Sequence, residues 1–132
     1  MKSMIIKTFT LAGLWLYSLS AFSGQTLNAT EIKQLFSGKT VTAYSEIKKA
    51  PVSLYYDKNG EVRGLFTSGK IGATKWWVKD NGQICLKSKN GDLCFEVVES
   101  DNQYQKYLVK SDGNRILAFS METFYSGNSN QY

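Results

Sequence analysis

The sequence predicts a small, mainly β protein in which about eight strands form an antiparallel up-and-down meander closed into a barrel, with one short N-terminal helix. Three observations support this fold. After residue 39 the chain is a series of short segments rich in β-branched and aromatic residues. Four Asn-Gly or Asp-Gly pairs, which favour the positive φ angles of tight hairpin turns, separate several of them. The links are all short, which favours a barrel over the alternative, a sandwich with crossing connections.

Residues 1–23 have the pattern of a secretory signal peptide. Two lysines precede the apolar stretch 9–19, and small residues then lead to a cleavage site near Ser23-Gly24. The alternative is an uncleaved anchor, but the apolar stretch is shorter than the roughly 20 residues that a membrane span needs. We therefore expect a periplasmic or secreted protein, with a single domain over 24–132 and no transmembrane segment in the mature chain.

One helix is expected over about residues 29–37. Asn28 or Thr30 can cap its N-terminus, Ile32 and Phe36 fall on one apolar face, and Gly38 follows its end. Because so short a helix needs a surface to pack against, we expect it across one mouth of the barrel or along its outside.

The strands are expected between residues 40 and 121, and the polar segment 126–132 is expected to fray. Alternation of apolar and polar side chains along the strands separates core-facing from outward positions. The expected strands are 40–44, 52–57, 61–67, 74–79, 83–87, 93–99, 104–110 and 115–121. The expected core positions are Trp76, Val78, Ile84, Leu86, Leu93, Phe95, Val97, Leu117 and Phe119.

Cys85 and Cys94 are expected to form a disulfide, because export carries the chain into an oxidising compartment. Alternation places both cysteines on the outer face of neighbouring strands. A two-residue turn at Lys89-Asn90 would set them directly opposite each other, whereas a turn at Asn90-Gly91 would offset them diagonally. The disulfide therefore favours the first register, or a bulge at Gly91.

A loose series of glycines, aromatic residues and cysteines over about residues 28–98 resembles a known family. The series comprises Glu31-Ile32, Leu35-Phe36-Ser37-Gly38-Lys39-Thr40-Val41, Tyr55-Tyr56-Asp57, Asn59-Gly60, Gly64, Gly72, Trp76-Trp77-Val78, Gly82, Cys85 and Cys94-Phe95. It resembles the bacterial exported family known as domain of unknown function 995, although Thr74 stands where that family tends to have glycine. The resemblance implies a small, exported, mostly β domain and brings no catalytic residues with it.

Composition argues against catalysis. The chain contains no histidine, so Ser-His and Cys-His dyads are excluded, and two thiolates without imidazole make a poor metal site. Five carboxylate residues lie beside expected turns, where Asp is common for conformational reasons: Asp57, Glu61, Asp80, Asp92 and Asp112. The net charge is +5, but part of it belongs to the expected leader, so nucleic acid is not an expected partner. We therefore expect no enzyme activity, no metal and no cofactor.

Binding is the function class that these exclusions leave. The leading interpretation is an interaction module of the bacterial envelope that contacts a protein or another envelope component through an outer surface. Its candidate residues are Trp77, Lys75, Lys79 and Lys87. The alternative is a barrel that carries a small ligand, which requires an interior cavity larger than a few water molecules. Its candidate interior residues are Trp76, Tyr56 and Phe95. A further alternative is an inhibitor of a secreted hydrolase.

Overall fold

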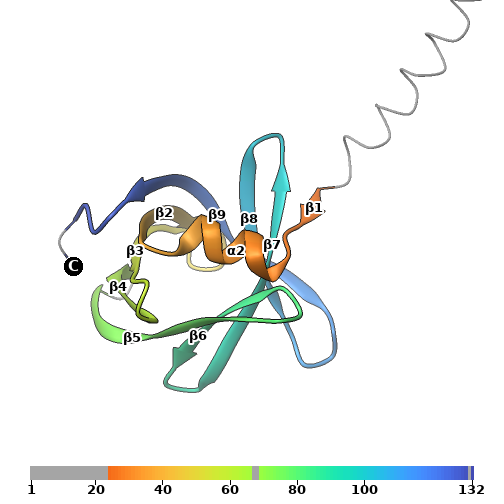
Figure 1. Ribbon diagram of the computed structural model, residues 1–132. Helices are drawn as coiled ribbons and strands as arrows, with labels where there is room; N and C mark the ends of the chain where they lie inside the picture. The colour runs from red at the N-terminus through yellow and green to blue at the C-terminus, as the bar shows by residue number, and fades with distance from the viewer. Residues whose placement is uncertain (1–23, 67–68, 131) are drawn as a thin grey trace, which may run out of the picture.

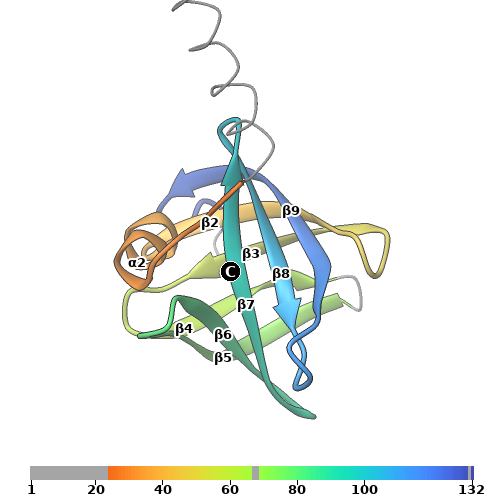
Figure 2. The ribbon, with the colours of Figure 1, turned by 90° about the vertical axis from the view of Figure 1, so that its right-hand side faces the viewer.

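A computed structural model describes residues 24–66, 69–130 and 132, so the predicted leader 1–23 lies outside the described residues. Eight antiparallel strands form a closed barrel, to which one short strand and one helix are added (Figures 1 and 2). The elements are β1 (Gln25–Thr26), α2 (Ala29–Phe36), β2 (Lys39–Ser45), β3 (Ala50–Tyr56), β4 (Glu61–Phe66), β5 (Gly69–Lys79), β6 (Gln83–Ser88), β7 (Gly91–Ser100), β8 (Gln103–Val109) and β9 (Arg115–Ser126). The predicted fold class is confirmed, and the structure is a barrel rather than a sandwich.

Each barrel strand pairs with the next strand in the chain, and β9 closes the barrel by pairing with β2. A register shift between Thr42 and Ala43 leaves one additional residue on β9 at this seam, between Met121 and Thr123. Such bulges increase local twist and coiling, which a small barrel needs in order to close. The short strand β1 pairs with the end of β7, outside the eight-strand ring.

Helix α2 lies across one mouth of the barrel (Figures 1 and 2). Asn28, rather than Thr30, is its N-cap: the Asn28 Oδ1 accepts a hydrogen bond from the Glu31 N–H, and the Glu31 Oε1 accepts one from the Asn28 N–H, both at 2.9 Å. Ile32 and Phe36 on its inner face are fully buried. The helix therefore closes this end of the barrel with apolar side chains.

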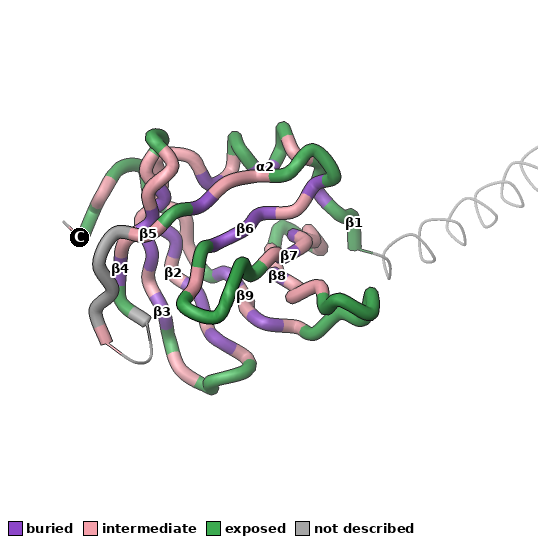
Figure 3. The backbone as a smooth tube through the Cα atoms, turned by 90° about the horizontal axis from the view of Figure 1, so that it is seen from below, coloured by how far each residue is buried: buried purple, intermediate pink, exposed green. Residues whose placement is uncertain are grey.

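Alternating burial along the strands matches the predicted core at most positions (Figure 3). Val78 and Phe119 are partly buried and pack against that core. Two predicted core positions are wrong. Leu93 faces inward opposite Leu86 but is 40% exposed, because it lies at the rim of the barrel. Leu117 is paired with Tyr107 and lies outside the core, because the register shifts between β8 and β9 at this point.

Gly127 and Ser129, which follow β9, are held by hydrogen bonds, and this differs from the expectation of a frayed tail. The Gly127 N–H donates to the Gly38 carbonyl at 2.8 Å, and the Thr40 hydroxyl donates to the Gly127 carbonyl at 2.7 Å. The Ser129 N–H donates in turn to the Thr40 Oγ1 at 3.1 Å. Thr40 is fully buried as a result, although it lies between core-facing positions of β2.

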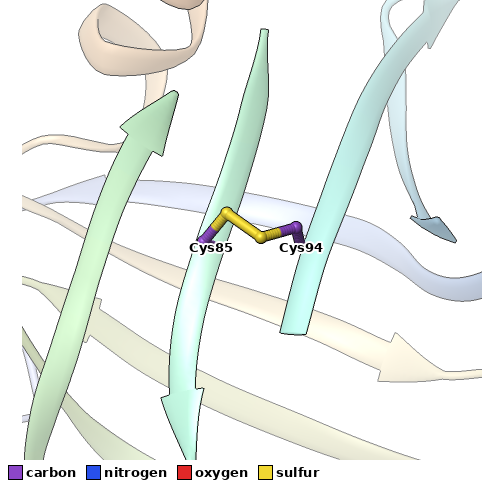
Figure 4. Close-up of a disulfide and its surroundings, with 2 residues drawn as sticks. All are labelled: Cys85 and Cys94. Atoms are coloured by element: carbon purple, nitrogen blue, oxygen red, sulfur yellow. A yellow bond between two sulfur atoms is a disulfide. The ribbon is translucent and has the colours of Figure 1, made fainter. Parts of the chain in front are cut away.

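The disulfide joins Cys85 on β6 to Cys94 on β7, with the two Cα atoms 4.1 Å apart (Figure 4). The two residues are direct register partners, and the pairing of Ser88 with Gly91 places the two-residue turn at Lys89-Asn90. The first of the two predicted registers is therefore confirmed. Although the disulfide lies on the outer face, Cys85 has no exposed surface.

Replacing both cysteines with alanine should lower the free energy of unfolding by about 2.5 kcal/mol, because the disulfide closes a short loop in the unfolded chain. Urea unfolding of the variant and of the oxidised wild type measures the difference. Reduced wild-type protein is the control, and its stability should match that of the variant. Equal stability of the variant and the oxidised protein would contradict this prediction.

Candidate binding site in the barrel interior

The two mouths of the barrel differ. Helix α2 covers one, while the hairpin turns β2–β3, β6–β7 and β8–β9 surround the other (Figure 2). Near this second mouth two apolar side chains are exposed: Leu93 at the start of β7 and Ile116 at the start of β9 are each 40% exposed. Ile116 is the register partner of Leu108, which packs against the core. Two large apolar side chains are therefore exposed at the end of the barrel opposite α2.

A cavity of about 10 Å³ lies inside the barrel. Its volume is on the order of the space that one water molecule needs. Most of its lining is apolar and includes Ala43, Leu86 and Met121, while the polar groups come from Tyr56 and Lys106. The cavity therefore combines an apolar wall with one amine and one hydroxyl.

Lys106 is the central polar residue of this interior, with a side chain only 3% exposed. Its Nζ donates a hydrogen bond to the Tyr56 Oη at 2.6 Å. The same Nζ lies 4.9 Å from the ring centroids of Phe36 and Tyr56, 5.4 Å from that of Phe95 and 5.8 Å from that of Phe119. These distances are within the range of cation–π attraction, so four rings from four elements stabilise the charged amine.

Strand alternation together with the strand register places these groups inside the barrel. Along β8, alternation puts Tyr104, Lys106 and Leu108 on one face, and both Tyr104 and Leu108 pack against the core. The register partner of Lys106 on β7 is Val97, which is fully buried. On β3 the same alternation ends on Tyr56. The amine therefore lies inside because its two apolar neighbours on that face do.

Among the described residues, Lys106 has no carboxylate partner. The ion pairs among residues 24–66, 69–130 and 132 involve other side chains: Lys49 with Glu46, Arg63 with Asp57, and Arg115 with Glu96. Burial without such a partner lowers the pKa of Lys106 to about 7, and burial raises the pKa of the Tyr56 hydroxyl well above its usual range. Near neutral pH the amine is thus present in both its charged and its neutral form.

The three residues that the sequence suggested for the interior are all buried: Tyr56, Trp76 and Phe95. Of these, Tyr56 lines the cavity and Phe95 contacts Lys106. Trp76 packs edge-on against Tyr56, with ring centroids 5.3 Å apart, and its indole N–H donates to the Asp57 carbonyl at 2.8 Å. Trp76 therefore holds Tyr56 in place. Sequence reasoning missed Lys106, whose only signal was its position between Tyr104 and Leu108.

The predicted outer surface lies apart from this interior. Trp77 is only half-buried and forms a cross-strand row with Cys85 and Cys94, so it is a neighbour of the disulfide rather than an isolated exposed aromatic. The fully buried Cys85 lies between its register partners Trp77 and Cys94. Part of this indole surface therefore packs on the protein itself.

The lysines near Trp77 are exposed, as outward positions should be. Lys75 has Glu61 as its register partner, and Lys87 has Asp92. Opposite charges directly across neighbouring strands attract, so the positive charge of this surface is largely balanced. Lys79 is paired with the neutral Gln83.

In ranges 24–66, 69–130 and 132, no three Asp, Glu or Cys side chains are grouped so that they could hold a metal ion. The described helix α2 is too short and too polar to span a membrane.

Stability should rise with pH between about pH 7 and about pH 9. The pKa of Lys106 is about 7 in the folded protein and near 10.5 in the unfolded chain, so the unfolded chain binds more protons in this window. The gain is at most about 1.4 kcal/mol per pH unit, and below about pH 7 this residue causes no further change. Urea unfolding across this range measures the effect.

The control for this prediction is Lys106→Met, which keeps a long side chain but cannot ionise. The free energy of unfolding of this variant should not rise between about pH 7 and pH 9. At about pH 7 it should exceed that of the wild type, because the cost of burying the amine is removed. If stability changes with pH in the same way in both proteins, the pH dependence does not come from Lys106 and the prediction is wrong.

Comparisons with protein-family models, with curated proteins and with solved structures find no match for this chain. The resemblance to domain of unknown function 995 therefore stays a prediction.

Proposed function

We propose that this chain is an exported, non-catalytic binding protein that holds a small apolar anion inside its barrel, with the anionic group against Lys106. One observation carries the proposal: a buried amine, with no carboxylate partner in the described part of the chain, lies beside a largely apolar cavity. A charged amine in such surroundings attracts an anion far more strongly than it would in water.

Packing alone does not account for a lysine at this position. The shift of the Lys106 pKa from 10.5 to about 7 corresponds to roughly 5 kcal/mol of penalty on the charged form. A methionine or leucine would fill the same space without that penalty. Perturbed ionisable groups inside a cavity are typical of functional sites, which supports a binding role.

The surroundings of the amine define the ligand class. The cavity wall is apolar apart from Tyr56 and Lys106, and the rim at Leu93 and Ile116 is apolar as well. A short hydrocarbon chain ending in a carboxylate matches this arrangement, with its chain directed toward the rim.

The present cavity is much smaller than the roughly 300–1,000 Å³ of a preformed ligand pocket. Entry of a ligand therefore requires side chains to move. Met121 lines the cavity and is suited to this, because its unbranched side chain adopts several conformations at little cost. This argues against a rigid carrier and for a site that opens as the ligand binds.

We rank the outer surface of Trp77, Lys75, Lys79 and Lys87 behind the interior as a docking place for a protein or envelope component. Trp77 is half-buried, and two of the lysines face carboxylates across the sheet. No feature of the described residues favours an inhibitor of a secreted hydrolase.

Hexanoate is the probe for the interior site, and isothermal titration calorimetry measures its affinity. Lys106→Met should weaken hexanoate binding by about 10–100-fold, since a hydrogen bond to a charged group contributes about 1.5–3 kcal/mol. The matched control is Lys87→Met, which removes an exposed lysine and should leave the affinity unchanged. Affinity should also fall as pH rises through about 7, because the amine loses its charge.

Hexanol, which lacks the anionic group, should bind much more weakly than hexanoate. Equal hexanoate affinity in the wild type and in Lys106→Met would overturn the proposal, as would equal binding of hexanol and hexanoate to the wild type.

A further inference from the structure

We propose that Lys106 is also a covalent capture site, at which the side-chain amine condenses with a small apolar aldehyde to form an imine inside the barrel. The inference rests on the proposed function in one respect, since the same mouth and cavity must admit the ligand. It differs in chemistry, because it uses the neutral amine rather than the charged one.

The reaction needs no oxidant or reductant. The Nζ lone pair attacks the carbonyl carbon, a C–N bond forms, and a proton from nitrogen reaches the carbonyl oxygen. The resulting carbinolamine then loses its hydroxyl group: the C–O bond breaks, the C=N bond forms, and the hydroxyl leaves as water. The products are one imine and one water molecule.

Tyr56 is placed to assist the loss of water. Its hydroxyl lies 2.6 Å from the Nζ, within reach of both the nitrogen and a hydroxyl group on the attached carbon. It can donate a proton to the departing hydroxyl and recover one from the nitrogen. Proton transfer therefore has a complete path within one pair of side chains.

Burial disfavours the charged form of the amine more than the four rings stabilise it, so the neutral, nucleophilic form is populated near pH 7. The side chains that face Nζ are Phe36 from α2, Tyr56 from β3, Phe95 from β7 and Phe119 from β9. Within the described structure, the Tyr56 hydroxyl is the only titratable group among them, and it stays neutral at ordinary pH because burial raises its pKa. No carboxylate on these elements faces the amine to hold a proton on it.

The neutral fraction separates this lysine from those on the surface. With a pKa of about 7, roughly half of Lys106 is neutral at neutral pH. An exposed lysine with an ordinary pKa is neutral only to about one part in several thousand under the same conditions. The reactive fraction at Lys106 is thus about 10³-fold larger, which compensates for its restricted access.

The site also suits the product. An uncharged imine fits an apolar enclosure better than an ammonium ion does, and the neighbouring rings leave little room for the water that would hydrolyse it. The hydrocarbon chain of the aldehyde would follow the same apolar path toward Leu93 and Ile116. An apolar aldehyde is therefore a better match than a polar sugar aldehyde.

The test treats the folded chain with hexanal at about pH 7, traps imines with cyanoborohydride, and locates the added hexyl group by peptide mass spectrometry. Lys106 should be labelled at least tenfold faster than Lys87, which is exposed. Labelling of Lys106 should increase between about pH 6 and pH 8 as the amine loses its proton. Lys106→Met should retain only the slow labelling of surface lysines.

Tyr56→Phe tests the second residue, because it keeps the ring and removes the hydroxyl. It should slow the labelling of Lys106 by about tenfold while leaving the rate at Lys87 unchanged. Circular dichroism shows whether each variant folds. If Lys106 in the folded wild type is labelled no faster than Lys87, the covalent proposal is wrong.

Hexanoate titration of the same protein separates the two proposals. Hexanoate binding without preferential labelling of Lys106 overturns the covalent proposal alone. Labelling of Lys106 without hexanoate binding supports covalent capture and overturns the anion-binding function. Failure of both probes overturns both proposals.

Discussion

The structure depends on the closure of the barrel between its first and last long strands. Thr42 on β2 and Thr123 on β9 are 81 residues apart in the chain, yet they are register partners and their hydroxyl groups are hydrogen-bonded. Closure removes the free edges that an open meander would expose and creates an enclosed interior. Every inward side chain must then fit a small common volume, and any polar group among them loses its contact with water.

Lys106 experiences the strongest effect of that enclosure. Its amine contacts Tyr56 from β3 and Phe36 from α2, which are brought together only when the barrel is closed and the helix covers its mouth. The Asn28–Glu31 capping box fixes the start of that helix and so helps to position Phe36. The pKa of Lys106 is therefore a property of the whole fold rather than of its own strand.

The sequence predicted the eight barrel strands and favoured the observed disulfide register, because hairpin pairing is local and turn residues such as Gly60 and Gly113 indicate it directly. It missed the short strand β1 and predicted β5 and β9 shorter than they are. It could not assign Lys106 to the interior. Residues 104, 106 and 108 form one face of β8 and residues 105, 107 and 109 the other, and the two faces are similarly apolar. Which face points inward is set by pairing with β7 and with β9, where a register shift occurs.

The two predicted core residues that were wrong show the same limit. Alternation correctly directs Leu93 inward, but it contains no information on how near a position lies to an open mouth. Leu93 is exposed because it lies at the end of the barrel that α2 does not cover. The two ends of the barrel therefore differ, and the Lys106 amine contacts the ring of Phe36 from the helix that covers one of them and the ring of Phe95 from β7. The proposed anion site depends on the buried amine of Lys106 and on the exposed apolar residues at the end that α2 does not cover.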